Sequence, residues 1–330
     1  MTSRLKVSLV VAAVALLAII VPFTSSFMIL LATRALVFSI LVMSLDILLG
    51  YTGLASLGQA AYLGIGAYTA AIFATKYHIG LGWDFWLVML LGTLFAAALA
   101  AVFGLLAIRA SGVYFLMITL ALGQCVWGLA YRWNSLTGGD NGINLRERPK
   151  FGGIDLGNEL TFFFLVFAVF CVALGLMYTL VRSPFGRSLA GIRERELRMK
   201  ILGYNTWLHK YIAFVIAGAF GGLSGVLWAH TAGIVSPVNV ELTTSVDALL
   251  MAVLGGSGTL VGGVIGTFIV FGLREFLSTI VPWWQYVLGI VYVATILYLP
   301  TGLMGIPERF SRQRTRPADQ QGEKLAPAAS

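Results

Sequence analysis

Residues 182–210 read RSPFGRSLAGIRERELRMKILGYNTWLHK, and they form the longest strongly charged run between two very apolar halves of the chain. Within this run, seven lysine and arginine side chains stand against two carboxylates, those of Glu194 and Glu196. The flanking halves have the composition of protein that lies in lipid, whereas the run has the composition of a segment that lies in water. The fold is therefore organised around this run.

The overall composition predicts a helical membrane protein. Of the 330 residues, 58% are hydrophobic and only 11% are charged, whereas a soluble domain carries about 25% charged residues. Apolar runs of about 20 residues recur, which is the length that a helix needs to cross a hydrocarbon core. A transmembrane β-barrel would instead show short segments of alternating polarity. We therefore expect an all-α polytopic membrane protein.

The apolar runs predict about ten transmembrane helices, with eight to ten as the range. A cleavable signal peptide is the alternative for the first helix, but no good small-residue cleavage site precedes the polar cluster at residues 24–26, which favours a retained helix. The count also depends on dividing residues 244–277 into two segments. The expected spans are residues 7–22, 27–48, 54–75, 85–108, 111–131, 161–181, 211–231, 244–256, 258–277 and 283–299.

The distribution of positive charge sets the predicted orientation, because cytoplasmic loops carry an excess of lysine and arginine. The excess lies at the amino end, in residues 182–210 and in the tail. We therefore expect both termini in the cytoplasm and residues 132–160 outside, and this placement argues against nucleic-acid binding. Residues 1–310 would form the membrane domain. Residues 311–330 lack apolar periodicity and are expected to form a disordered basic cytoplasmic tail.

Two glycine-rich stretches, residues 50–66 and 255–263, interrupt apolar segments in the two halves of the chain. Non-helical backbone at membrane depth survives only where it is buried in protein or lines a water-filled path, and broken segments in both halves point to a transport pathway. Close helix packing through small residues is the alternative. The candidate path residues are Gly58, Gln59, Gly64, Gly66, Tyr114, Thr119, Gly255, Gly256 and Gly263.

The sequence lacks the motifs of a catalytic or nucleotide-binding protein. A phosphate loop of the G-x-x-x-x-G-K-[ST] type is absent, and the three histidines have no metal-ligand spacing. We therefore expect no enzyme activity, no metal and no cofactor on this chain. Cys125 and Cys171 lie within apolar runs and are expected to be small buried residues rather than a disulfide pair.

Few ionisable residues lie within the expected spans, namely Arg34, Asp46, Asp247 and Arg274 with Glu275. An ionisable residue inside a membrane is by default a candidate functional residue, because burying a charge in hydrocarbon costs free energy. Here each position lies near the end of a span, which favours a structural role. The scarcity of acids in the middle of the spans counts against an ion-coupled carrier.

The charged run predicts a short helix beside the membrane. Ser183 and Pro184 suit a helix start, and Gly203 suits a helix stop. Phe185, Leu189, Ile192 and Met199 fall on one face of that helix. A basic helix of this kind binds anionic lipid or docks a partner protein, and the two glutamates within the run favour a protein partner slightly.

Four segments of the chain together resemble one family. The run at 182–210 contains S-P-x-G-R, then I-R-E-x-E, then a glycine, then a lysine before A-F. Three further segments follow the family's order, and they read GYTGLASLGQAAYLGIGAYTAA (50–71), GVYFLMITLALGQ with LTGGDNGI (112–124 and 136–143) and LLMAVLGGSGTLVGGVIGTF (249–268). Over about residues 40–310, the sequence resembles permeases of branched-chain amino acid ABC importers of the LivM type.

The resemblance implies a multi-pass subunit of the bacterial cytoplasmic (inner) membrane. Its implied partners are a homologous LivH-type permease, two cytoplasmic ATPase subunits that hold ATP and Mg, an extracytoplasmic binding protein and membrane lipid. Arg198 and Met199 stand where the family usually has two alanines, and Lys200 follows, which implies an altered contact with the ATPase. The residues that the resemblance assigns to ATPase coupling are Ser183, Pro184, Gly186, Arg187, Ile192, Arg193, Glu194, Glu196 and Gly203.

The function that the resemblance implies is translocation of branched-chain or related amino acids, driven by ATP hydrolysis on separate subunits. An alternative keeps the family and changes the cargo to urea, short amides or another small metabolite. An ion-coupled secondary transporter and a structural or signalling membrane protein are further alternatives. The sequence of the membrane subunit does not distinguish the cargoes.

Overall fold

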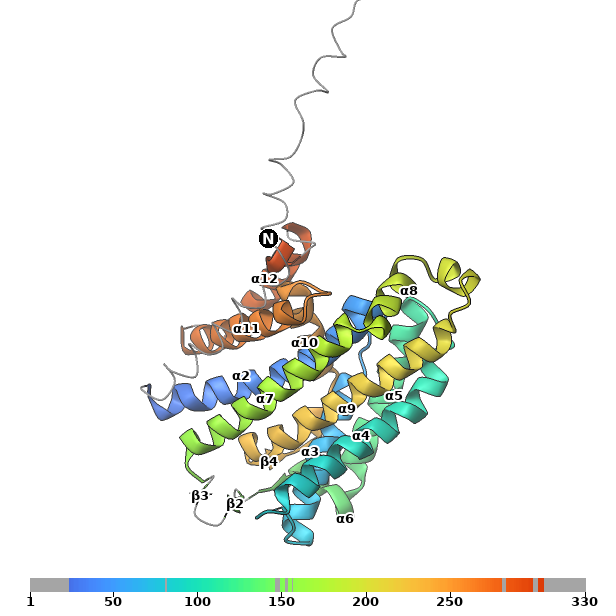
Figure 1. The fold of residues 1–330 in the computed structure, drawn as a ribbon. Coiled ribbons are helices and arrows are strands. Elements are labelled where there is room, and N and C mark those ends of the chain that lie inside the picture. Colours follow the sequence, from blue (N-terminus) through green and yellow to red (C-terminus); the bar gives the residue numbers. More distant parts are fainter. Residues whose placement is uncertain are drawn as a thin grey trace, which may run out of the picture.

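The computed structural model describes residues 24–80, 82–145, 149–151, 154–155, 157–280, 283–298 and 302–305. The first expected span and the expected tail lie outside these residues. Figure 1 shows the arrangement of the described elements. In chain order they are α2 (Ser26–Asp46), the π-helix η2 (Ile47–Thr52), α3 (Gln59–Lys76), α4 (Phe85–Ala107), α5 (Val113–Arg132), α6 (Asn134–Thr137), η3 (Gly139–Asn141), β1 (Ile143–Asn144), β2 (Lys150–Phe151), β3 (Ile154–Asp155), α7 (Glu159–Arg182), α8 (Pro184–Ile201), α9 (Thr206–Ala232), β4 (Ile234–Val235), η4 (Pro237–Val240), α10 (Leu242–Gly255), α11 (Leu260–Ile280), α12 (Trp284–Tyr298) and η5 (Leu303–Gly305).

Long apolar helices dominate this arrangement, so the chain is a polytopic helical membrane protein. In the part of the chain that the structure describes, six helical segments are long and apolar enough to cross a membrane. They are Ser26–Thr52, Phe85–Ala107, Val113–Arg132, Glu159–Arg182, Thr206–Ala232 and Leu260–Ile280.

Each expected span after the first has a helical counterpart. The division of residues 244–277 is confirmed, because α10 ends at Gly255 and α11 begins at Leu260. The largest differences concern α3, which begins at Gln59 rather than at residue 54, and α9, which begins at Thr206 rather than at residue 211. The late start of α3 follows from Gly53, which ends η2 in a left-handed conformation with φ 74°.

Small residues let the central helices approach one another closely. Gly218 and Gly222 of α9 face Ala100 and Ala96 of α4 so tightly that an added Cβ atom would overlap those side chains. Gly66 of α3 lies equally close to the backbone of Gly222. Packing of this kind is typical of helix association in membranes, where close backbone approach replaces the hydrophobic effect. The helices α3, α4 and α9 therefore form a tightly packed unit within the bundle.

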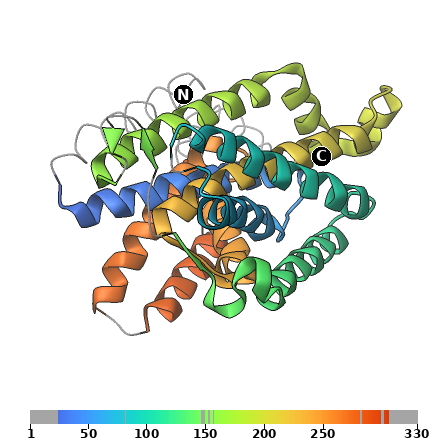
Figure 2. The ribbon, with the colours of Figure 1, turned by 90° about the horizontal axis from the view of Figure 1, so that it is seen from below.

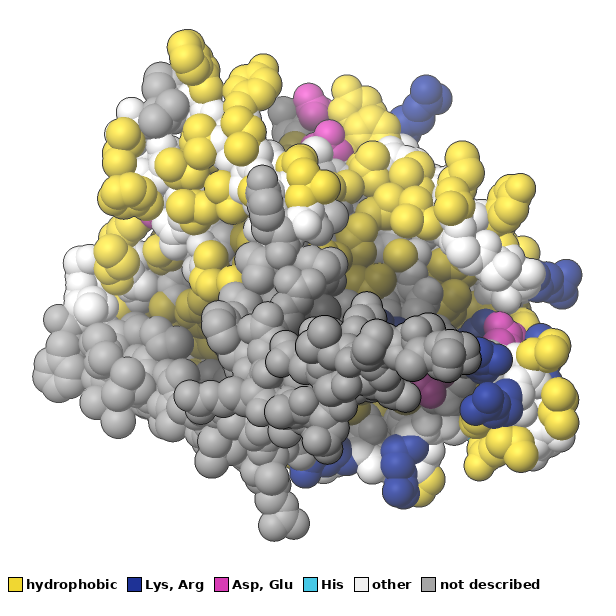
Figure 3. All heavy atoms as spheres, turned by 90° about the horizontal axis from the view of Figure 1, so that it is seen from above, with side chains coloured by type: hydrophobic (Ala, Val, Ile, Leu, Met, Phe, Trp, Pro, Cys, Tyr) yellow, Lys and Arg dark blue, Asp and Glu magenta, His cyan; other side chains and the backbone are white. Residues whose placement is uncertain are grey.

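The bundle has two distinct ends. The α8 region projects from one end in both ribbon views (Figures 1 and 2). The short strands lie at the opposite end, where β1 pairs antiparallel with β4 through Ile143 and Val235, and β2 pairs with β3. Figure 3 shows hydrophobic side chains over much of the visible described surface, with most of the visible lysines and arginines gathered toward one side. The charged run thus lies at one end of the apolar bundle.

The expectation that the two cysteines are buried is wrong. Cys125 and Cys171 are both free and exposed on the surface of α5 and α7. A helix that faces lipid is apolar on its outer surface as well as on its packed surface. Position within an apolar run therefore did not distinguish a lipid-facing cysteine from a packed one.

Candidate functional site

The helix α8 begins at a sharp corner that its sequence specifies. The Ser183 hydroxyl donates to the carbonyl of Leu180 at 2.6 Å and accepts from the Gly186 N–H at 3.3 Å, so one residue ends α7 and caps α8. Pro184 occupies the first turn, where its missing N–H costs nothing. Gly186 lies against the Val181 backbone, which an added Cβ would overlap. The predicted helix start is confirmed.

Within α8 the backbone breaks at Arg195, whose φ of −152° and ψ of 93° are not helical. We call residues 184–194 the inner half of α8 and residues 196–201 its outer half. The inner half buries Leu189 and Ile192 against the bundle, with exposed fractions of 1% and 3%. The outer half exposes its apolar side chains, with Leu197 at 74% and Ile201 at 80%.

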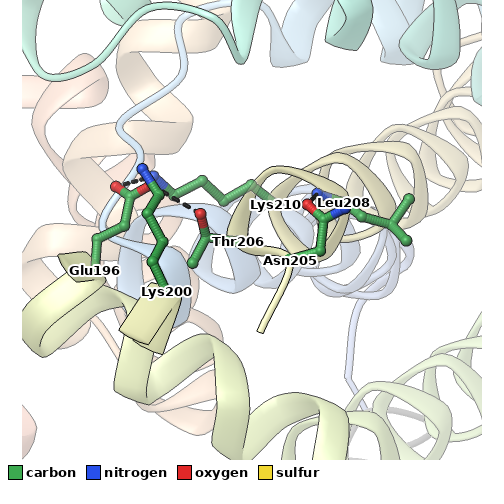
Figure 4. Close-up of polar contacts among 6 residues, drawn as sticks. All are labelled: Glu196, Lys200, Asn205, Thr206, Leu208 and Lys210. Carbon is green, nitrogen blue, oxygen red and sulfur yellow. Dashed lines mark hydrogen bonds and ion pairs between the residues drawn. The ribbon is translucent and has the colours of Figure 1, made fainter. Parts of the chain in front are cut away.

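The outer half is fastened to the start of α9 through one carboxylate, that of Glu196. Its Oε1 accepts from the Thr206 hydroxyl at 3.0 Å, and its Oε2 accepts from Lys210 Nζ at 2.6 Å. Lys200 forms a further ion pair with it at 3.2 Å. Figure 4 shows these contacts converging on Glu196. Partial burial raises the pKa of Glu196, but the bonds from Lys210, Lys200 and Thr206 outweigh burial and hold it below the usual range.

Arg193 connects the inner half of α8 to the first glycine break. Its guanidinium donates from Nη1 to the carbonyl of Gly50 in η2. The stem of the same side chain lies over Gly53, where Cγ would be 3.2 Å from an added Cβ. A π-helical turn such as η2 is rare and often occurs at functional sites. The charged run therefore bonds directly to irregular backbone at the end of a membrane-spanning helix.

The second glycine break meets the first at the same place. Asp46, at the end of α2, is fully buried, and its Oδ1 accepts from the Gly258 N–H at 2.7 Å. Gly50 lies so close to Gly258 that an added Cβ would overlap that N–H and the Asp46 carboxylate. Arg193 lies beside the same residues, because its Nη1 would be 3.2 Å from a Cβ added at Gly258. We call Asp46, Gly50, Gly53, Arg193 and Gly258 the glycine junction.

The sequence-predicted coupling residues divide between these features. Ser183, Pro184 and Gly186 form the corner, and Ile192 lies in the core beneath the inner half. Arg187 and Glu194 are exposed. Gly203, with φ 86°, lies in the turn between α8 and α9.

Among the predicted path residues, the structure brings Gly58, Gln59 and Thr119 together. The Thr119 hydroxyl accepts from the Leu57 N–H at 3.2 Å, and Gly58 lies against the Thr119 carbonyl. The Gln59 side chain is fully buried, and neither of its amide atoms has a hydrogen-bond partner among the described residues. A buried amide without partners is costly, so this is the most unusual polar group of the predicted set.

The other predicted path residues lie apart from that group. Gly64 packs against Val240 and Gly66 against Gly222, whereas Tyr114 is 75% exposed on the surface of α5. Gly255 packs against Gly262 across the second glycine break, and Gly263 packs against Val42 of α2. Gly256 has φ 114°, which a side chain would strain. Most of these glycines therefore lie where two helices approach closely.

Sequence reasoning missed most of the glycine junction as a unit. Asp46 was assigned a structural role, and Gly50, Gly53 and Gly258 were not among the candidate site residues. The signal that could have found them is the position of Asp46 four residues before Gly50, at the edge of the first break. No cluster of three or more His, Cys, Asp or Glu side chains suited to a metal occurs among the residues that the structure describes.

Comparison with known proteins relates most of the chain to one group of membrane proteins. The model of a family described as "Branched-chain amino acid transport system / permease component" matches residues 27–298. The high-affinity branched-chain amino acid transport system permease protein LivM of Escherichia coli (strain K12) is 30% identical, over 92% of this chain and 76% of that protein.

More distant relatives extend the same comparison. The probable branched-chain amino acid transport permease protein LivM of Methanocaldococcus jannaschii is 23% identical, over 81% of this chain and 89% of that protein. LivH of Escherichia coli (strain K12), a high-affinity branched-chain amino acid transport system permease protein, is 31% identical over 42% of this chain and 46% of that protein. No solved structure gives a significant match.

Proposed function

We infer that the chain, which belongs to the family of permease components of branched-chain amino acid transport systems, is the membrane-spanning subunit of an ABC importer for branched-chain amino acids. It carries the cargo, whereas ATP and Mg belong to separate ATPase subunits. It has about ten transmembrane helices, both termini in the cytoplasm and α8 as the cytoplasmic coupling helix. It is located in the bacterial cytoplasmic membrane.

The observation that carries this proposal is the glycine junction. Through Arg193, the inner half of α8 bonds to η2, and through Asp46, the end of α2 bonds to the loop between α10 and α11. A displacement of α8 would therefore be transmitted to both glycine-interrupted segments, because hydrogen bonds rather than a flexible linker join them. Irregular backbone with glycines is where helices can change their relative positions at low cost. This arrangement suits a switch between outward and inward access.

The outer half of α8 is the surface on which an ATPase subunit would dock. Leu197 and Ile201 are exposed there by 74% and 80% of their surfaces, next to the exposed cations Arg198 and Lys200. An apolar patch with a charged rim is typical of a protein interface. Two ATPase subunits would serve this chain and a homologous LivH-type permease.

The opposite end of the bundle is the proposed docking surface for an extracytoplasmic binding protein. There β1, from the segment after α5, pairs with β4, from the segment after α9, and the two segments form one surface. The cargo would enter from this end and leave at the α8 end. The predicted path residues, Gln59 above all, remain our candidates for its route.

Reconstitution tests the proposal. The chain, co-expressed with a LivH-type permease, two ATPase subunits and a binding protein, should take up radiolabelled L-leucine in proteoliposomes only with ATP. Arg193→Glu with Arg198→Glu should either prevent ATPase binding or leave ATP hydrolysis without uptake. Gly256→Val or Gly263→Val should abolish uptake in an assembled complex, because Gly256 has φ 114° and Gly263 lies against Val42.

Several outcomes would contradict this reading. Normal uptake by the doubly reversed variant would remove α8 from the coupling pathway. Uptake by this chain alone with an ion gradient would make it a secondary carrier. ATP-dependent uptake of urea or acetamide, with L-leucine excluded, would keep the importer and change its cargo.

A further inference from the structure

Between α9 and α10 the chain runs beside α3 without forming a long helix. Residues 236–241, which we call the η4 segment, contain only the short 3₁₀ turn η4. Val240 of this segment packs so closely on Gly64 of α3 that a Cβ added to Gly64 would overlap its methyl groups. Gly64 lies twelve residues before the end of α3 at Lys76, which is about 18 Å along a helix. The η4 segment therefore lies beside α3 rather than beyond its end.

The helix α4 gives the depth of the η4 segment independently. Gly92 of α4 lies against Gly66 of α3, with 3.4 Å between a Cβ added to Gly92 and the Gly66 carbonyl oxygen. Gly92 is seven residues from the start of α4 at Phe85, or about 10 Å inside a helix that is long enough to span the membrane. Val240 contacts α3 two residues farther from the α3 end than Gly66 does. The η4 segment therefore lies at a depth that α4 spans within the membrane.

The outward side of the η4 segment does not suit lipid. Val238 is 64% exposed, and Thr243, in the first turn of α10, is exposed as well. Glu241 is partly exposed, its Oε2 accepts from the Thr243 hydroxyl at 3.4 Å, and it forms no ion pair within 4.0 Å among the described residues. Irregular backbone does not face lipid within the hydrocarbon region, because lipid offers its polar groups no hydrogen bonds. A carboxylate at that depth is also expensive.

The outward side of α4 provides the contrast at the same depth. Its exposed side chains include the large apolar groups of Leu87, Leu90 and Leu94. They project from an unbroken helix, in which the backbone groups bond internally. This side of the bundle suits lipid. The η4 side requires a cover that offers hydrogen bonds as well as apolar contact.

We propose that the second, homologous permease packs against the η4 segment and the first turn of α10, an inference that rests on the proposed function and names the surface at which its two membrane subunits meet. A protein surface suits this side, because it provides apolar contact for Val238 together with hydrogen-bond donors or a cation for Glu241. The depth selects a membrane-spanning partner, because a protein that stays outside the membrane does not enter the hydrocarbon region.

Site-specific photocrosslinking tests the proposal in the complete transporter in nanodiscs, with the LivH-type permease, two ATPase subunits and the binding protein. Val238→p-benzoylphenylalanine should crosslink to the LivH-type permease in at least tenfold higher yield than Leu94→p-benzoylphenylalanine, which should crosslink to phospholipid. Leu94 is the matched control, because it is exposed on α4 two residues from Gly92 and so lies at the depth of the η4 segment. Mass spectrometry of the crosslinked products identifies each partner.

A second measurement tests the chemistry of the contact. Glu241→Leu removes the carboxylate, so the LivH-type permease should dissociate from the detergent-solubilised complex at least threefold faster. Asp84→Leu is the control, because Asp84 is an exposed acid at the start of α4 that makes no capping hydrogen bond, and dissociation should be unchanged there. On a surface that faces lipid, Glu241→Leu would leave the rate unchanged or lower it.

The inference is overturned if Val238 crosslinks to phospholipid, to the binding protein, to a second copy of this chain or to nothing. Unchanged or slower dissociation in Glu241→Leu overturns it as well. ATP-dependent uptake of L-leucine tests the proposed function separately. If uptake occurs while Val238 does not crosslink to the LivH-type permease, this inference fails and the proposed function stands. If neither the LivH-type permease nor the ATPase subunits co-purify with the chain, both fail.

Discussion

The two halves of α8 have similar charge but opposite relations to the rest of the molecule. The inner half buries Leu189 and Ile192, and Arg193 bonds to Gly50. The outer half exposes Leu197 and Ile201 and is fastened to the start of α9. The break at Arg195 separates them.

This difference shows how one short helix can contact both the transmembrane bundle and a partner protein. A segment that must transmit movement has to be rigidly bonded to what it moves. A segment that must receive a partner has to keep apolar surface uncovered, and uncovered apolar surface is normally kept small in a folded protein. The helix meets both demands by changing direction between them. Substitutions on either side of Arg195 should therefore have separable effects.

A large effect on both fold and transport is expected at Gly50, the residue that the inner half contacts. In Gly50→Ala the new Cβ would overlap the Gly258 N–H and the Asp46 carboxylate. We expect overpacking to cost about 3 kcal/mol and ATP-dependent uptake to be lost. Thermal unfolding of the purified complex and proteoliposome uptake measure this. Gly175→Ala in α7 is the control, since nothing lies within 4 Å of its added Cβ, and an equal loss there would refute the packing argument.

A smaller effect on the fold, with a large one on coupling, is expected for Arg193→Gln. The variant loses the charged hydrogen bond to the Gly50 carbonyl, which is worth about 1.5–3 kcal/mol. ATPase subunits should still co-purify, whereas uptake per ATP hydrolysed should fall about tenfold, since about 1.4 kcal/mol corresponds to a factor of ten. Arg109→Gln, at an exposed arginine outside α8, should leave that ratio unchanged. An unchanged ratio in Arg193→Gln would separate the inner half from transmission.

Glu196→Gln should weaken the bundle by less than about 1 kcal/mol, because the ion pairs of this residue are partly exposed. The bonds lower the pKa of Glu196 below its usual 4.5 in the folded protein. The contribution to stability is therefore complete above pH 4.5 and is lost as the pH falls through the lowered pKa. The difference in unfolding free energy between wild type and variant should be smaller at pH 3.5 than at pH 7. An equal difference at the two pH values would contradict the assignment.

The smallest effect on stability is expected in the outer half, for Leu197→Gln combined with Ile201→Gln. Both side chains are at least 74% exposed, so the free energy of unfolding should change by less than about 0.5 kcal/mol. ATPase subunits, in contrast, should no longer co-purify. Leu189→Ala is the opposite case, since it removes buried apolar volume and should cost about 2–5 kcal/mol. If the outer double variant retains its ATPase, the exposed face is not the docking surface.

Local signals in the sequence predicted the start of α8 and its packed face. Ser183 and Pro184 define the corner by their own chemistry, and the spacing of Leu189 and Ile192 identified the face that the structure buries. The break at Arg195 had no such signal, because neither glycine nor proline lies there. It accompanies the bonds from Glu196 to α9, which no local pattern encodes.

The glycine junction was beyond sequence reasoning for a related reason. Its defining hydrogen bond joins Asp46 to Gly258, which lie 212 residues apart in the chain. Each break could be predicted separately from the sequence, because glycines within apolar runs are easy to recognise. Only the folded bundle shows that the two breaks touch each other and Arg193. Similarly, apolar composition predicted the helices but not which of their faces meet lipid.

The pairing of β1 with β4 also constrains the order in which the protein can be completed. Ile143 meets Val235 only after the whole of α7, α8 and α9 has been synthesised. Because closing a long loop before its contacts form is entropically unfavourable, the surface at this end assembles after the helices between its strands are in place. A nascent chain that stops before residue 234 therefore lacks this surface, although it already contains the whole of α8.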